Sequence, residues 1–147
     1  MPIKRQTIIN AVKTRLQTIL TAGGYYTNLG SHVDELRVTV YQQSELPAVS
    51  IVETGNENLN ELASNWIDQY LNIEFHITVS GNSSAADIRK AIYDVLKAIG
   101  TDDTWSGNAI QTHYVNDELK KAGGEILLAS AIVRIKIKYR TTIWSET

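Results

Sequence analysis

The chain has 147 residues, of which 43% are hydrophobic and 20% charged, a composition typical of a folded globular protein and not of a disordered or membrane-spanning one. It contains no cysteine, which excludes disulfide bonds and thiolate chemistry. The formal net charge is −2, but the window between Arg37 and Arg89 holds seven acidic residues and no lysine or arginine. Such segregation of charge bears on association and steering, not on the fold.

Two amphipathic helices are predicted from the spacing of apolar residues. The first covers residues 3–22, and Gly23 and Gly24 supply its C-terminal stop. The second begins at a capping box formed by Ser84 and Asp87 and ends at Gly100.

Alternating apolar residues predict five β-strands. They cover residues 36–42, 47–53, 70–80, 108–116 and 125–140, and polar loops are expected at 54–65 and 106–108. The element order α, β, β, β, α, β, β predicts an α+β fold in one domain, residues 1–147. We expect a mainly antiparallel sheet with two helices packed on one face and a long C-terminal strand.

The C-terminal strand carries a row of four cations: Arg134, Lys136, Lys138 and Arg140. They alternate with apolar residues, so the row is expected on the sheet face opposite the helices, together with Glu74 of another strand. One interpretation is a head-to-tail contact with the acidic block of a second copy, which can close into a ring. A second is a solvated edge in which Glu74 pairs with one of the cations. A third is a phosphate-binding surface.

No catalytic or metal-binding motif is present in the sequence. The three histidines His32, His76 and His113 lie in separate segments without ligand spacing, and no nucleotide-binding or nucleophile motif occurs. We therefore expect no enzymatic activity, no cofactor and no metal. No apolar run approaches the ~20 residues that span a bilayer, so no membrane association is expected.

The series of elements resembles a known family. Its parts are "ELPAVSIVETGNE", the strand "YLNIEFHITVSG", the capped helix "SSAADIRKAIYDVLKAIG" and the closing strand "ILLASAIVRIKIKYRT". After a short N-terminal amphipathic helix, this order is similar to that of the tail terminator proteins of long-tailed bacteriophages and of related minor tail and tail-completion proteins. The resemblance covers roughly residues 3–141.

The resemblance implies a structural virion protein without catalysis. Members form a ring, commonly a hexamer, that caps the tail tube, ends its polymerisation and joins the tail to the head or neck. The expected partners are further copies of the chain, the tail tube protein and a head-completion or neck protein. DNA is expected to pass through the lumen without specific binding. Assembly is expected in the host cytoplasm and final residence in the tail or neck of the virion.

Two groups of residues are expected at the contacts of such a ring. The subunit interface is assigned to Arg134, Lys136, Lys138, Arg140 and Glu74. Docking to tube or neck, or a position in the lumen, is assigned to Glu53, Glu57, Leu59, Glu61, Leu62, Trp105 and Trp144. Charge reversal at Arg134, Lys136 and Lys138 is expected to leave the monomer folded and to impair the ring. The alternatives are a head-to-tail adaptor ring and, more distantly, a nucleic-acid-binding module.

Overall fold

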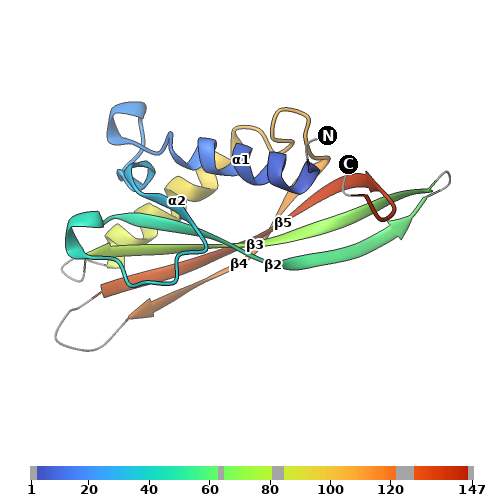
Figure 1. Cartoon of the computed structure of the whole chain (residues 1–147). Coiled ribbons are helices and arrows are strands. Elements are labelled where there is room, and N and C mark those ends of the chain that lie inside the picture. Colours follow the sequence, from blue (N-terminus) through green and yellow to red (C-terminus); the bar gives the residue numbers. More distant parts are fainter. Residues whose placement is uncertain (1–2, 63–64, 81–84, 122–127, 146–147) are drawn as a thin grey trace.

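The fold is an α+β arrangement in which two helices cover one face of a five-stranded sheet (Figure 1). A computed structural model describes residues 3–62, 65–80, 85–121 and 128–145. The helices are α1 (Lys4–Leu16) and α2 (Ala85–Gly100). The strands are β1 (Val33–Glu35), β2 (Ala48–Glu61), β3 (Trp66–Ser80), β4 (Gln111–Lys121) and β5 (Leu128–Thr142).

The sheet has the order β1-β2-β3-β5-β4 and confirms the mainly antiparallel prediction. Only β1 runs parallel to its neighbour β2, and the other three pairs are antiparallel. Strands β3 and β5 pair over 15 residues, from Trp66 opposite Thr142 to Ser80 opposite Leu128. This long central pair positions every surface described below.

The core lies between the helices and the apolar phase of β3 and β5. On β3, Leu71, Ile73, Phe75 and Ile77 are buried, as their alternation predicts. On β5 the apolar phase, Tyr139 included, is buried in the same cluster. Each fully buried side chain of this size contributes roughly 1.5–3 kcal/mol to folding. The helices leave the opposite, polar face of the sheet uncovered. The segment after β1 covers only part of that face, where Arg37 N donates to Ser50 Oγ at 3.1 Å and Tyr41 is buried.

The first helix ends earlier than predicted. It stops at Leu16, and the hydroxyl of Thr18 donates a hydrogen bond to Arg15 O at 2.6 Å. A short 3₁₀ helix follows at Thr21–Gly23. Ile19 still packs into the core, which explains why its spacing fits a helix. Gly24 has a φ of 91° and closes the 3₁₀ turn in a left-handed conformation that glycine adopts without strain.

The predicted strand over 36–42 is wrong. β1 ends at Glu35, because Leu36 adopts a φ of 48° and turns the chain out of the sheet. The guanidinium of Arg37 then holds the following segment with hydrogen bonds to Glu45 and to the backbone oxygen of Thr39. A regular alternation of apolar residues is thus present without strand pairing.

The predicted loop over 54–65 is wrong for residues 54–61. These residues extend β2 and pair with β3 through two register shifts, one at Gly55 (φ 138°). Their polar side chains suit an outer strand that needs no buried face. We call this part of the molecule the arm: residues 54–61 of β2, 66–72 of β3 and 137–145 at the end of β5. Figure 1 shows that β2 and β3 project past the end of α1.

The remaining predictions differ at their ends. The fourth predicted strand, 108–116, is observed as Gln111–Lys121, because Trp105–Ala109 form a turn whose first and last residues are buried. The last strand is observed as Leu128–Thr142, and its predicted first residues, 125–127, lie outside the described residues. Ser84 of the predicted capping box also lies outside them. The second helix is otherwise confirmed.

Candidate assembly surfaces

The uncovered face of the sheet carries a network of ion pairs centred on Arg134. Its Nε donates to Glu74 Oε2 at 2.7 Å, and its Nη2 donates to Glu118 Oε1 at 3.0 Å. Glu74 also contacts His76 Nε2 at 2.9 Å. The hydrogen bond with His76, together with that from Arg134, lowers the pKa of the Glu74 carboxyl. Lys120 Nζ lies 3.5 Å from Glu118 Oε1, so two cations balance two carboxylates where the three strands meet.

Two further cations of the row also find partners in the same chain. Arg140 binds Asp68 through two hydrogen bonds, of 2.7 and 3.1 Å, and this pairing lowers the pKa of the Asp68 carboxyl. The ammonium of Lys136 lies 4.5 Å from the ring centroid of Tyr70, within cation–π range. The expected pairing of Glu74 with a cation of its own chain is confirmed. The expectation that the row lies on an edge strand is wrong, because β5 lies between β3 and β4.

This geometry changes the expectation for the interface. A cation that already holds two carboxylates offers little unbalanced charge to a neighbour. Charge reversal at Arg134 places a carboxylate beside Glu74 and Glu118, so the expectation that the monomer tolerates it does not fit the observed pairing. Assignment of the row to a subunit contact stays a prediction, and its electrostatic support now rests mainly on Lys138.

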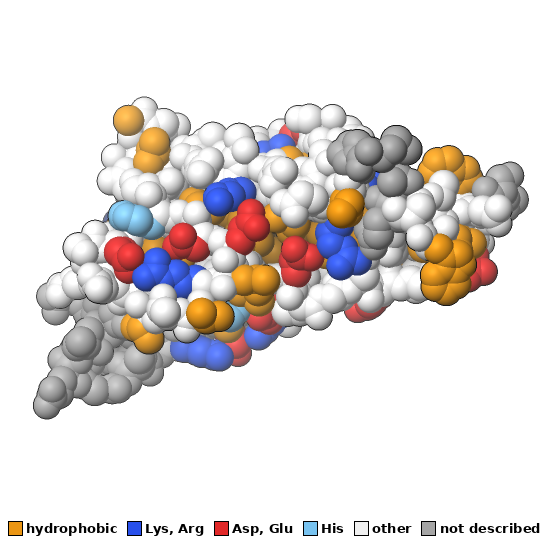
Figure 2. Space-filling model, viewed as in Figure 1, with side chains coloured by type: hydrophobic (Ala, Val, Ile, Leu, Met, Phe, Trp, Pro, Cys, Tyr) orange, Lys and Arg blue, Asp and Glu red, His pale blue; other side chains and the backbone are white. Residues whose placement is uncertain are grey.

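Three large hydrophobic side chains are exposed near the end of the arm. Trp144 is 99% exposed, and Trp66 and Leu59 are each more than a third exposed. The backbone brings their segments close, since Ile143 N donates to Asn65 O at 2.8 Å and Leu62 N donates to Trp66 O at 2.7 Å. Figure 2 shows hydrophobic side chains gathered at this end of the molecule, on the right. We call Leu59, Trp66 and Trp144 the arm tip.

The acidic residues expected in a loop lie instead along β2. Glu53 is half-buried, whereas Glu57 and Glu61 are exposed. Glu57 accepts a hydrogen bond from Asn72 Nδ2 at 3.1 Å, and none of these three carboxylates forms an ion pair with another described residue. The arm therefore presents unpaired negative charge beside an apolar tip.

The expectation that Trp105 contacts a partner is wrong, because this side chain is completely buried. Its indole Nε1 donates to Thr112 Oγ1 at 2.7 Å, and the guanidinium of Arg15 lies 4.1 Å from its ring centroid. Trp105 anchors the turn between α2 and β4 to the core. The sequence offers no signal for this, since Trp105 and Trp144 both stand among polar turn residues.

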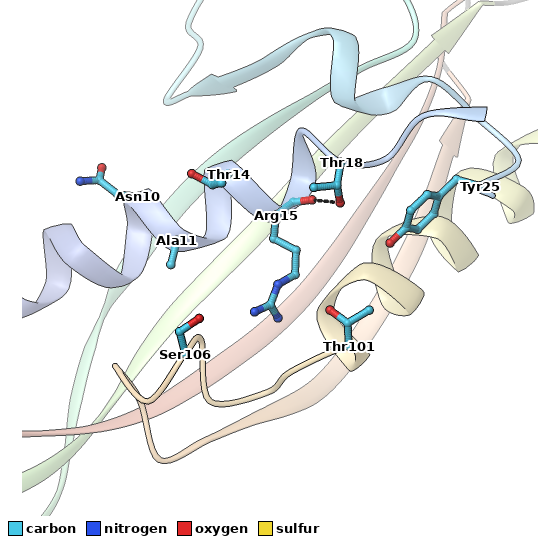
Figure 3. A pocket seen from close by; sticks show the side chains of 8 residues that line it. All are labelled: Asn10, Ala11, Thr14, Arg15, Thr18, Tyr25, Thr101 and Ser106. Carbon is cyan, nitrogen blue, oxygen red and sulfur yellow. Dashed lines mark hydrogen bonds between the residues drawn. The ribbon is translucent and has the colours of Figure 1, made fainter. Parts of the chain in front are cut away.

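A groove of about 480 Å³ opens above this anchor, between α1 and the start of the turn (Figure 3). Its lining residues are Asn10, Ala11, Thr14, Arg15, Thr18, Tyr25, Thr101 and Ser106. Arg15 donates to Ile99 O at 3.3 Å and also to Asp102 O, carbonyls at and beyond the end of α2. Because its guanidinium also pairs with the Asp102 carboxylate at 3.7 Å, Arg15 serves the fold and leaves the groove without a free charge.

Comparison with models of known protein families and with curated proteins finds no match for this chain. Its function is therefore inferred from its own residues and from the resemblance of its element order. Among the described residues, no group of three His, Asp or Glu side chains could hold a metal ion. No helix in the part that the structure describes is long and apolar enough to cross a membrane.

Sequence reasoning missed an aromatic and cationic surface on α2. The rings of Tyr26 and Tyr93 pack at 5.7 Å, and Lys90 and Lys97 lie over Tyr26 and Tyr25 at 5.8 and 4.9 Å. The helical spacing of Lys90, Tyr93 and Lys97 puts them on the outer side of α2 and could have revealed the patch. Asp94 of α2 holds the segment that carries Tyr26 against the helix. Its fully buried carboxylate accepts hydrogen bonds from the backbone N–H groups of Tyr26 and Thr27.

Proposed function

We propose that the protein is a structural component of a bacteriophage tail. It forms a ring, of six copies by analogy, that caps the tail tube, ends its polymerisation and joins the tail to the head or neck. The observation that supports this best is the arm tip: an arm that projects beyond the helices and ends in exposed tryptophans. This role requires no catalysis, cofactor or metal, in keeping with the sequence.

The physical basis is the free energy gained when the exposed hydrophobic side chains of the arm tip are removed from water. A tryptophan side chain buries about 150–250 Å² at an interface. At about 25 cal/mol per Å², the transfer of Trp144 alone is worth roughly 4–6 kcal/mol before the costs of association. Tryptophan is also among the residues that most often dominate binding at protein interfaces. The arm tip is therefore our candidate for the contact with the tube or the neck.

The uncovered face suits a position along the channel. Its charges are largely balanced in pairs such as Arg134 with Glu74 and Arg140 with Asp68. A surface of this kind offers phosphates few free cations, and the unpaired carboxylates of the arm repel them. DNA can then pass the ring without being retained.

The close alternative is an adaptor ring that binds the head side only. It shares the ring and the exposed arm, and differs in the partner. The nucleic-acid-binding alternative loses support from the intrachain pairing of Arg134 and Arg140, although the cationic patch on α2 keeps a test worthwhile.

The experiment that tests the proposal mixes the purified protein with tail tubes assembled from tube protein alone. Sedimentation separates tubes from free protein, and the retained protein is quantified. Wild type is expected to sediment at a ratio fixed by the number of tube ends, and Trp144→Ala is expected to remain in the supernatant. Binding that scales with tube length, or none at all, contradicts the proposal.

A further inference from the structure

Unpaired negative charge lies along the outer edge of the arm. β1 pairs with β2 only at Val49–Ile51, so no described strand covers the outer edge of β2 beyond these residues. Glu57 and Glu61 on this part of β2 are exposed and form no ion pair with another described residue. The hydrogen bond that Glu57 accepts from the neutral Asn72 leaves its charge unbalanced. We call Glu57 and Glu61 the acidic edge.

The two helices carry the opposite charge. α1 has four lysine and arginine residues and no acidic one, and α2 has three such cations and two acidic residues. One of these two, Asp94, is buried and accepts its hydrogen bonds from Tyr26 and Thr27. The exposed side of α2 therefore has three cations and a single carboxylate, that of Asp87.

The cations of α2 are only weakly engaged within the chain. Arg89 is exposed and forms no hydrogen bond or ion pair with a described residue. Lys90 Nζ lies 3.9 Å from Asp87 Oδ1, a contact between two half-exposed side chains that contributes little. Lys97 Nζ donates to Gly24 O at 3.1 Å, which satisfies one donor and leaves the charge unbalanced.

These cations surround an exposed aromatic ring. The helical spacing of Arg89, Lys90, Tyr93 and Lys97 puts them together on the outer side of α2. Tyr93 is 52% exposed, and its ring packs at 5.7 Å against that of Tyr26, which is 63% exposed. We call Arg89, Lys90, Tyr93 and Lys97 the helix patch. Such a surface suits an acidic partner that also brings an apolar side chain.

The acidic edge and the helix patch lie at different ends of one chain. Figure 1 shows the arm projecting past the end of α1 on the right, whereas α2 lies on the left. A contact between the two surfaces therefore joins two copies. Because its two sides are different surfaces, the contact repeats head to tail and can close into a ring.

We propose that the acidic edge of one copy binds the helix patch of the next copy. The inference rests on the proposed ring and names the surfaces that join its neighbours. The occupant is a second copy because the arm supplies what the patch lacks: carboxylates on a strand without lysine or arginine, and the exposed Leu59 between them. Trp144 stays available for the contact with the tube or the neck.

The spacing of the charges agrees with this contact. Glu57 and Glu61 are about 13 Å apart along β2, at about 3.3 Å per residue. Arg89 and Lys97 are about 12 Å apart along α2, at about 1.5 Å per residue. The two carboxylates belong to opposite faces of the sheet, so a helix that lies along the outer edge of β2 can contact both.

Charge exchange between the two surfaces tests the contact. Glu57→Lys/Glu61→Lys reverses the acidic edge, and Arg89→Glu/Lys90→Glu reverses the helix patch. The matched control, Glu35→Lys/Asp103→Lys, changes the net charge as much as the first variant, at two exposed carboxylates outside both surfaces. Sedimentation velocity over a range of concentrations follows the association of each protein, and circular dichroism verifies its fold.

Each reversed variant alone is expected to associate at least about tenfold more weakly than the wild type and the control. An equal mixture of the two is expected to regain the wild-type ring, because the reversed edge of one variant then meets the reversed patch of the other. Association of the wild type is expected to weaken with added salt, since both surfaces are exposed.

Two results separate this contact from the ring. A wild-type ring that persists in both reversed variants, or a mixture that does not recover, overturns the contact and leaves the ring standing. A wild type that stays monomeric overturns the contact and the ring together.

Two further measurements cover the remaining outcomes. If a reversed variant does not fold, the neutral variants Glu57→Gln/Glu61→Gln and Arg89→Gln/Lys90→Gln replace the reversed pair, and unchanged association of both overturns the contact. Retention of DNA by the wild type that is lost on reversal of the helix patch assigns this surface to nucleic acid and also overturns the proposal.

Discussion

Arg134 Nε lies 2.7 Å from Glu74 Oε2, so the centre of the cation row is neutralised within its own chain. The same guanidinium reaches Glu118 on β4, which ties together the three strands β3, β5 and β4. The row is thus first a feature of the sheet. Its first role is to join the strands of one chain, and any role in assembly is secondary.

Removal of the Arg134 charge is expected to lower the unfolding temperature. Arg134→Gln leaves Glu74 and Glu118 without their shared cation, whereas Lys138→Gln, on the same strand and face, removes a charge with no direct hydrogen bond to a described carboxylate. Thermal unfolding by circular dichroism compares the two. A larger decrease for Lys138→Gln than for Arg134→Gln would be at odds with the pairing described.

Acid is expected to destabilise the protein through Glu74 and Asp68. Their pKa values lie below the ordinary 4.5 and 3.8, because each carboxylate accepts hydrogen bonds in the folded state. This stabilisation is fully present above those ordinary values and is lost as the pH falls through the lowered ones. The urea midpoint of the wild type should fall below about pH 4.5 more steeply than that of Glu74→Gln/Asp68→Asn. Parallel curves would show that the two pairs do not contribute.

The two tryptophans in turns are expected to behave in opposite ways. Trp105→Ala removes a completely buried side chain and should cost about 3–5 kcal/mol in the free energy of unfolding. Trp144→Ala removes an exposed one and should change this free energy by less than about 0.5 kcal/mol. Chemical denaturation measures both. Equal losses would mean that the arm tip is packed, which would remove it as a docking surface.

Asp94 is expected to be essential for the position of Tyr26 and Thr27. Asp94→Ala leaves two backbone N–H groups and the Thr27 hydroxyl without their acceptor, at a cost of roughly 1–3 kcal/mol. The matched control Asp103→Ala alters an exposed carboxylate and should change stability by less than about 0.5 kcal/mol. Hydrogen exchange at the amides of Tyr26 and Thr27 locates the effect, and unchanged protection there would contradict it.

We expect that the protein does not retain DNA at physiological salt concentration. Two arginines of the cation row are already bound to carboxylates, so few phosphates can be neutralised. Immobilised protein is challenged with duplex and single-stranded DNA at about 0.15 M salt. Retention that weakens steeply with added salt would favour the nucleic-acid-binding module, and the patch of Lys90, Tyr93 and Lys97 would be the first place to look.

The sequence predicted the elements whose pattern and packing agree. Strand β3 alternates cleanly because one face is buried along most of its length, and α2 has a wide apolar stripe. Residues 54–61 of the arm were missed because Leu59 is their only large apolar residue, so they show no alternation and become a strand only by pairing with β3. The segment 36–42 was mistaken for a strand because the alternation is real, while a left-handed turn at Leu36 takes it out of the sheet.

The candidate surfaces were predicted less well than the fold. Sequence alone placed the cations and Glu74 on one face but could not decide whether the partner of Arg134 lies in the same chain. That depends on the register of β3 against β5, which sets Glu74 opposite Arg134. Only tertiary contacts distinguish the buried Trp105 from the exposed Trp144. Thr112 and Arg15 contact the first, and none of the described residues buries the second.

Electron microscopy of negatively stained tail tubes, with and without the protein, tests the central claim most directly. A ring-shaped density should close one end of each tube and stop its further growth, and Trp144→Ala should leave the ends open. Tubes that keep elongating in the presence of excess wild-type protein, with no density at either end, would contradict the account.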